Sequence, residues 1–167
     1  MLIRRMLWLP AATLVAMALL GIALQPATRL TVTTDDGRVL VCEQMAPGDT
    51  VTLVFTHSMY GVEVRESWRV VNGRLVRTGI ETDRAAAAEY YATDGAVERT
   101  DGGFAVISPP LTVDALVVRV DQIGRHRLRS DGTDEISLAD RVEGSAAVTI
   151  QTRHQALLQQ GIAGCRG

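Results

Sequence analysis

The sequence predicts a mainly β fold: an antiparallel sandwich or barrel of about ten short strands, with one or two short helices. Three observations predict it. Runs rich in Val, Leu, Thr and Ile recur from residue 29 onward, turn dipeptides separate them at intervals of about ten residues, and no long stretch has helical periodicity. The turn dipeptides are Asp36-Gly37, Pro47-Gly48, Asn72-Gly73, Asp94-Gly95, Asp101-Gly102 and Asp131-Gly132.

The clearest local unit is a hairpin that turns at Asn72-Gly73, because this dipeptide supplies two residues with positive φ. It joins strands that we expect at 64–71 and 74–80. We expect the other strands at 29–34, 39–44, 50–58, 103–107, 113–120, 126–130, 135–138 and 146–152.

Two segments favour helix instead of strand. The alanine-rich stretch 83–93 predicts a short helix that Asp83 could cap. The stretch 152–161 predicts a second short helix that ends at Gly161. We therefore divide the chain into an N-terminal segment (1–28), an antiparallel β domain (29–153) and a short helix with a tail (154–167).

The N-terminal segment is typical of a signal peptide or a membrane anchor helix. Arg4 and Arg5 precede an uncharged run from 6 to 24, which at about 1.5 Å per helical residue approaches the roughly 30 Å of a bilayer core. Small residues at Gly21 and Ala23 leave cleavage open. In either case the two arginines favour the cytoplasmic side, so we expect the β domain outside the cytoplasm: on the outer face of the cytoplasmic membrane if anchored, or secreted or periplasmic if cleaved.

Composition narrows the range of functions. The formal net charge is −2, which disfavours a general nucleic-acid role. The chain has only two cysteines, Cys42 and Cys165, which could pair across a long loop in an oxidising compartment or remain free thiols. His57, His126 and His154 have no short fixed spacing, so we predict no metal site. No nucleophile elbow, phosphate loop or calcium loop is present, and we predict no cofactor.

Candidate functional residues lie in the stretch FTHSMYGVEVRESW, from 55 to 68. Alternation places Phe55 and Trp68 in the core and makes His57 extend an apolar row. Glu66 interrupts the apolar row of the next strand, where a carboxylate is costly unless it is paired. If the chain turns around 59–62, His57 faces Val64 and Glu66 lies diagonally, within reach.

Three interpretations of these residues stay open. His57 and Glu66 could form a structural hydrogen bond that fixes strand register. Alternatively, His57, Ser58, Tyr60 and Glu66 could line a small polar pocket that binds a ligand or a partner. The pair could also serve acid–base catalysis, although His57 and Ser58 diverge in a regular strand, which weakens a nucleophile–base couple.

A row of arginines marks a later strand. Arg125, Arg127 and Arg129 alternate onto one face, which fits a charged row on an edge strand that discourages aggregation, or a contact with anionic lipid or an acidic partner.

The run FTHSMYGVEVRESWRVVNGRLV and the later segment VVRVDQIGRHRLRSDGTDEISLADRVEGSAAVTI resemble the bacterial family numbered eighteen-fifty among the domains of unknown function. His57, Ser58 and Glu66 match its signature positions. The resemblance implies a small exported β-rich protein, often encoded beside TRAP-type transporters with TAXI-type solute-binding proteins. We therefore expect a non-enzymatic accessory domain that binds a TRAP-type permease or a TAXI-type binding protein. The alternatives are a membrane-associated enzyme that uses the His57–Glu66 pair and a small-molecule sensor.

Overall fold

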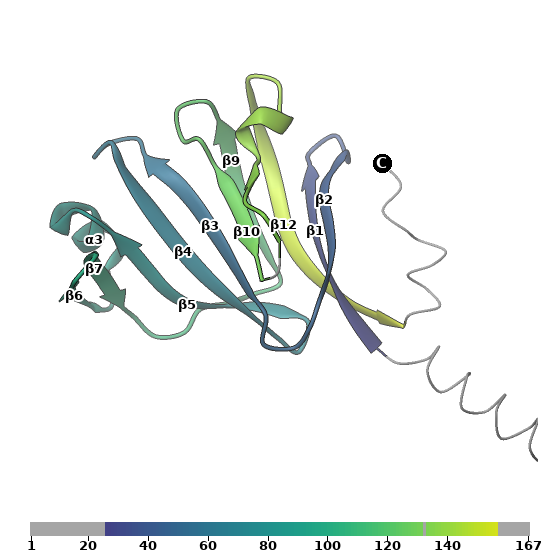
Figure 1. Ribbon diagram of the computed structural model, residues 1–167, viewed down its shortest axis with the longest axis horizontal. Helices are drawn as coiled ribbons and strands as arrows, with labels where there is room; N and C mark the ends of the chain where they lie inside the picture. The colour runs from purple at the N-terminus through teal and green to yellow at the C-terminus, as the bar shows by residue number, and fades with distance from the viewer. Residues whose placement is uncertain (1–25, 132, 157–167) are drawn as a thin grey trace, which may run out of the picture.

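Two antiparallel sheets make up the computed structural model, which describes residues 26–131 and 133–156 (Figure 1). The smaller sheet has the order β2–β1–β12–β9, with strands Val39–Met45, Pro26–Thr34, Ser145–Ala156 and Ala115–Asp121. The larger has the order β11–β10–β3–β4–β5–β7–β6, with strands Ile136–Ser137, Arg127–Ser130, Thr50–His57, Val62–Val71, Arg74–Thr82, Gly103–Ile107 and Ala96–Thr100. A further short strand, β8 (Thr112–Val113), pairs with β5.

Alternation along the strands gives each sheet an apolar face, and these two faces share one buried core. Leu53 of β3 and Trp68 of β4 pack in the same cluster as Leu30 of β1 and Ile150 of β12. Burial of these side chains is the main favourable term in folding, at about 1.5–3 kcal/mol for each large apolar side chain. The predicted mainly antiparallel β fold is confirmed, and the strands described do not close into a barrel.

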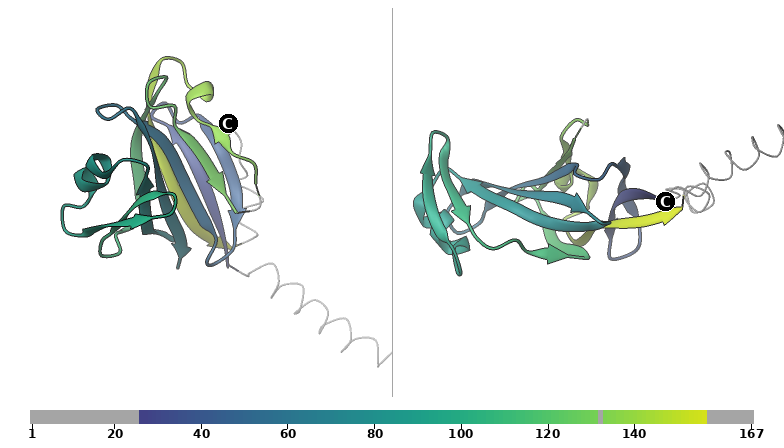
Figure 2. Two further views of the ribbon diagram at one scale, coloured as in Figure 1. Left: turned by 60° about the vertical axis from the view of Figure 1, so that its left-hand side comes forward. Right: turned by 90° about the horizontal axis from the view of Figure 1, so that it is seen from below.

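The larger sheet extends beyond the smaller one, and helix α3 (Ala85–Tyr91) covers part of the remaining apolar face. Ala88 of the helix packs against Val64, Ile80 and Val106, which lie on β4, β5 and β7. Phe55 contacts this second cluster and also the main core. Both views in Figure 2 show α3 at the end of the larger sheet that is away from β1 and β2.

The hairpin at Asn72-Gly73 forms as predicted. Asn72 and Gly73 have φ of 51° and 72°, and β4 and β5 flank them. One strand was not predicted: β6, whose sequence AVERT has little apolar alternation. The stretch expected as one strand at 113–120 is divided, because β8 pairs with the larger sheet and β9 with the smaller.

Two predictions about helices are corrected. The residue at the N-cap of α3 is Arg84, which makes no side-chain capping bond, so Asp83 does not cap it. Residues 152–156 belong to β12 instead of a helix, because pairing with β1 continues to Ala156. The remainder of that predicted helix and the N-terminal apolar helix lie outside the described residues. Within the described residues, no helix has the length and apolar character to cross a bilayer.

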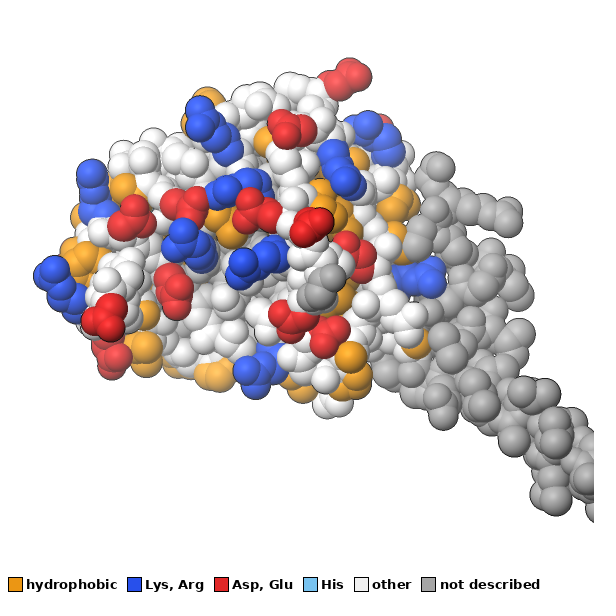
Figure 3. Space-filling view, in the orientation of Figure 1, with side chains coloured by type: hydrophobic (Ala, Val, Ile, Leu, Met, Phe, Trp, Pro, Cys, Tyr) orange, Lys and Arg blue, Asp and Glu red, His pale blue; other side chains and the backbone are white. Residues whose placement is uncertain are grey.

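Charged side chains of both signs are interspersed on the face that Figure 3 shows. On the larger sheet, Arg127 forms ion pairs with Glu63 and with Glu135. Strand β10, which carries Arg127, lies between β3 and β11, so the predicted edge-strand position of the arginine row is wrong. Arg125 lies in the preceding turn and not in the strand.

The first and last strands of the β domain bring its two ends side by side. Pro26 at the start of β1 is paired with Ala156 at the end of β12. Figure 1 shows that the β3–β4 turn, at the end of β3, lies at the opposite end of the sheets. The candidate site is at this opposite end.

Candidate functional site

The β3–β4 turn positions His57. The strand pairing ends at His57 opposite Val62, and the turn closes with a hydrogen bond from the Gly61 N–H to the His57 carbonyl at 2.7 Å. Gly61 has a φ of +63°, which glycine adopts without steric cost. The inward-facing side chain of His57 is only 8% exposed.

All three tyrosines of the chain surround the His57 ring. The centroid of His57 lies 4.9 Å from that of Tyr60, 5.0 Å from Tyr90 and 5.7 Å from Tyr91. The last two contacts are edge-to-face, a favourable geometry for aromatic rings. The tyrosines of α3 thereby fix the helix against the end of β3.

A backbone hydrogen bond sets the proton position on His57. The Met59 N–H donates to Nδ1 at 3.2 Å, so Nδ1 carries a lone pair. In neutral imidazole the proton then resides on Nε2. His57 therefore presents a hydrogen-bond donor at Nε2, which suits ligand binding better than proton abstraction.

The turn between β9 and β10 forms the opposite wall. The Asp121 carboxylate accepts hydrogen bonds from the backbone N–H groups of Ile123 and Gly124, at 3.0 and 2.7 Å. The Gly124 carbonyl accepts a bond from the Thr56 N–H at 2.7 Å, which ties this turn to β3. Arg125 completes the turn with a φ of +47°.

His126 follows this turn and stacks on Phe55, with ring centroids 5.4 Å apart and planes inclined by 15°. Burial lowers the pKa of His126, and the Asp121 carboxylate opposes this effect. The buried Nδ1 has no hydrogen-bond partner among the described residues. Gly124 permits this arrangement, because a Cβ there would lie only 2.7 Å from His126 Nδ1.

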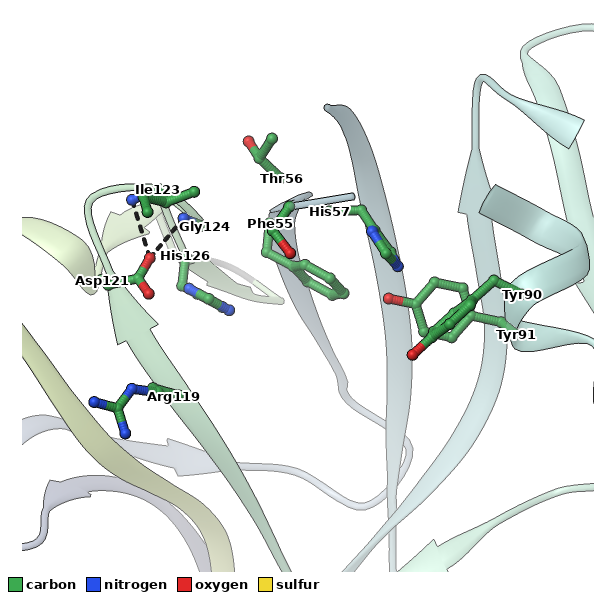
Figure 4. A pocket seen from close by; sticks show the side chains of 11 residues that line it. Phe55, Thr56, His57, Tyr90, Tyr91, Arg119, Asp121, Ile123, Gly124 and His126 are labelled. Atoms are coloured by element: carbon green, nitrogen blue, oxygen red, sulfur yellow. Dashed lines mark hydrogen bonds between the residues drawn. The ribbon is translucent and has the colours of Figure 1, made fainter. Parts of the chain in front are cut away.

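Between the two walls lies a half-open pocket of about 470 Å³ (Figure 4). Phe55 and His57 of β3 lie between Asp121 and His126 on one side and the two tyrosines of α3 on the other, as Figure 4 shows. Exposed apolar side chains from three segments border this end of the molecule: Met59 at 70%, Tyr90 at 56% and Ile123 at 70%. The pocket thus combines aromatic walls, hydrogen-bonding groups and an apolar rim.

Glu66 of β4 lies at a distance from His57 along the larger sheet. It pairs with Leu53, four residues before His57, which corresponds to about 13 Å along the strand. Burial raises the pKa of Glu66, while the Arg77 guanidinium and the Trp68 indole oppose this effect. The buried Trp68 Nε1 nevertheless has no partner at hydrogen-bond geometry among the described residues, so its interaction with Glu66 is electrostatic.

Tyr91 connects Glu66 to the pocket. Burial, the Glu66 carboxylate and Tyr90 together raise the pKa of Tyr91 to about 12. The Tyr91 hydroxyl therefore stays protonated at neutral pH and can donate a hydrogen bond within the pocket.

The sequence profile described as "Domain of unknown function (DUF1850)" matches residues 51–138, more than half of the chain. The chain belongs to this family. No curated protein and no solved structure matches the chain. The DUF1850 match extends from β3 to just beyond β11, so it includes both walls of the pocket.

Within this DUF1850 domain, the residues predicted for the site have different positions. His57 and Ser58 line the pocket, and Tyr60 packs on His57. The predicted register, with Val64 opposite His57, is wrong, because Val62 occupies that position. No hydrogen bond or ion pair joins His57 to Glu66 in the structure described. Their shared role in binding remains a prediction.

The other predicted residues are the two aromatic residues expected in the core and the two cysteines. Trp68 is buried in the main core, and Phe55 is partly buried between the two clusters. Cys42 lies on β2. Cys165 lies outside the described residues, so its pairing with Cys42 remains a prediction. Residues 26–131 and 133–156 contain no group of three or more His, Cys, Asp or Glu side chains that could hold a metal ion.

The pocket residues that sequence reasoning missed include Tyr90, Tyr91, Asp121 and His126. The scarcity of aromatic residues was an available signal for the tyrosines, since two of only three are adjacent in a helix. Asp121 and His126 had no such signal, because their positions depend on how the chain passes from β9 in the smaller sheet to β10 in the larger one.

Proposed function

We propose that this protein is an extracytoplasmic accessory domain of a TRAP-type solute transporter, and that it acts by non-covalent binding at the pocket between His57 and His126. The carrying observation is the pocket itself. It has aromatic walls, and it opens at an end bordered by exposed Met59, Tyr90 and Ile123. Exposed apolar residues around a hollow are typical of interaction sites.

The N-terminal sequence supports the proposed location. Arg4 and Arg5 before an apolar run favour export of the domain. The pocket lies at the end opposite Pro26, so an anchored domain would present it away from the membrane surface. This orientation favours a binding protein or a soluble ligand over the membrane-embedded part of the permease.

Binding accounts for the site better than catalysis. The Nδ1 atom of His57 is occupied by the Met59 N–H, so the neutral ring offers a donor and no free base. Strand register separates His57 from Glu66 by four residues, which removes the direct contact that the acid–base alternative requires.

Gene deletion in the native host tests this proposal. We expect deletion to lower uptake by the transporter and the full-length protein to co-purify with transporter subunits from detergent-solubilised membranes. The double substitution Tyr90→Ala and Ile123→Ser should fail to restore uptake. The matched control is Val71→Ser, which changes an exposed apolar residue at the β4–β5 turn and should restore uptake fully.

Unchanged uptake after deletion would contradict the transporter role. Substrate turnover by the purified protein that is lost in His57→Ala would establish the enzyme alternative instead. A small molecule that binds the pocket without turnover, in a strain whose uptake is unaffected, would establish a sensor.

A further inference from the structure

Strand β9 has one unpaired edge. It pairs with β12 through a continuous ladder from Ala115↔Gln151 to Asp121↔Ser145, without a bulge. No strand described pairs with its other edge. Outside that ladder, the backbone of β9 makes one hydrogen bond among the described residues, from the Arg125 N–H to the Asp121 carbonyl. Within this part of the chain, the backbone groups along the outer edge therefore have no strand partner.

The other sheet edges have features that discourage pairing. Strand β11 has only two residues, and β6 exposes Glu98 and Arg99. Strand β2 pairs with β1 through an irregular register. By contrast, β9 has the sequence ALVVRVD, contains no proline, and exposes 64% of Val117. A long, regular, apolar edge of this kind is a template for strand addition.

The pocket lies beside this edge. Arg119 and Asp121 of β9 line one side, and Tyr90 and Tyr91 of α3 line the other (Figure 4). An extended chain on the β9 edge would thus run next to the pocket. Since alternate side chains of a strand point to the same face, one of them would reach the aromatic walls. The edge supplies backbone recognition, and the pocket supplies side-chain recognition.

We propose that β9 binds an extended segment of a partner protein by strand addition, and that one apolar side chain of this segment occupies the pocket. The inference rests on the proposed function, because the pocket is the same binding site. Val117, Arg119 and Asp121 alternate along β9, so the segment has an apolar residue opposite Val117 and an acidic one opposite Arg119. Proline is excluded wherever the segment must donate a backbone hydrogen bond.

A single segment fits this site better than a second copy of the chain. Helix α3 lies across the pocket from β9. An isolated strand can enter between the two, whereas the β9 edge of a second copy would bring its whole sheet and its own α3. Self-association is therefore an outcome that the test must distinguish.

Selection of random heptapeptides on the immobilised full-length protein tests the proposal. The Val117→Lys variant serves as the counter-selection target, since lysine at an edge discourages strand pairing. We expect the enriched peptides to lack proline at every second position, where the backbone N–H must donate to β9. The most enriched peptide, made synthetically, should bind the native protein and lose affinity about tenfold or more with Val117→Lys. Val71→Lys is the matched control and should leave affinity unchanged.

Two further measurements identify the mode of binding. Two N-methylated versions of the peptide are compared, one methylated at the odd backbone nitrogens and one at the even. Methylation keeps the side chains but removes hydrogen-bond donors, so the version that loses the donors facing β9 should not bind, and the other should. Hydrogen exchange should slow at β9 and stay unchanged at β2 and β6. An unchanged melting temperature will show that Val117→Lys is folded.

Several results would overturn the proposal: no enrichment over the Val117→Lys target, equal binding of both methylated peptides, or protection at another edge. A dimer of the free protein that Val117→Lys abolishes would assign the edge to a second copy. The transporter role can fail independently of strand addition. If the protein binds the peptide but its deletion leaves uptake unchanged, only the transporter role is refuted. If uptake requires the protein but is unchanged by Val117→Lys, only strand addition is refuted.

Discussion

Replacement of Asp121 by alanine should destabilise the protein through the loss of one defined turn. The carboxylate accepts two backbone hydrogen bonds, from Ile123 at 3.0 Å and from Gly124 at 2.7 Å. A hydrogen bond to a charged group contributes about 1.5–3 kcal/mol. Asp121 is half-buried, so we take the lower value for each bond and expect a loss of about 3 kcal/mol. Asp121→Asn keeps a neutral acceptor and should lose about half as much.

Urea unfolding of the full-length protein, followed by circular dichroism, measures these differences. A loss of about 3 kcal/mol corresponds to a melting temperature lower by roughly 6–12 °C for a domain of this size. The control is Asp114→Ala, which removes an exposed ion pair with Arg74 and should change stability by less than about 0.5 kcal/mol. The reasoning would be refuted if Asp121→Ala cost no more than this control, or if Asp121→Asn cost as much as Asp121→Ala.

Three further predictions follow from the site. Gly124→Ala should displace the His126 ring and lower the melting temperature, and the added substitution His126→Ala should recover part of the loss; strictly additive effects would contradict the contact. Glu66→Gln should stabilise the protein at pH 7. Burial raises the pKa of Glu66, so its protonated form stabilises the fold at acid pH, and this contribution is lost as pH rises through the folded-state pKa. Glutamine stays neutral and avoids this loss. The gain should therefore shrink as pH falls toward 4 in unfolding measurements, about the pKa of an unfolded glutamate, and should be absent for Glu98→Gln. Burial raises the pKa of Tyr91 to about 12, so ultraviolet titration should show a tyrosine step near pH 12 that Tyr91→Phe removes.

Local sequence signals predicted much of the fold because strands and tight turns depend on neighbouring residues. Asn72-Gly73 specified both its turn and the two strands around it. The short strand β6 was not predicted because it has five residues and little apolar alternation. Among the described residues it pairs with β7 alone, so its stability comes from tertiary pairing and not from a local pattern. The end of β12 was read as helix because its pairing with the start of β1 has no local signature.

The site was predicted only in part, for a similar reason. The alternation that places His57 on the apolar face is local, and the structure confirms its inward position. The register was wrong because the β3–β4 turn is one that sequence alone did not define, and a shift of two residues moved Glu66 away from His57. His126 reaches the pocket only because the chain crosses from one sheet to the other after Asp121, and this long-range step leaves no periodic signal.

The adjacency of Pro26 and Ala156 has a practical consequence for protein engineering. A short linker could join these two positions, and new chain ends could be opened at the Asp36-Gly37 turn between β1 and β2, at the end of β1 away from Pro26, without interrupting a strand. Such a circular permutant should keep both sheets while it reverses which end of the domain is tethered. It would allow the pocket to be held toward a surface or away from it, so that the effect of orientation on partner capture can be measured directly.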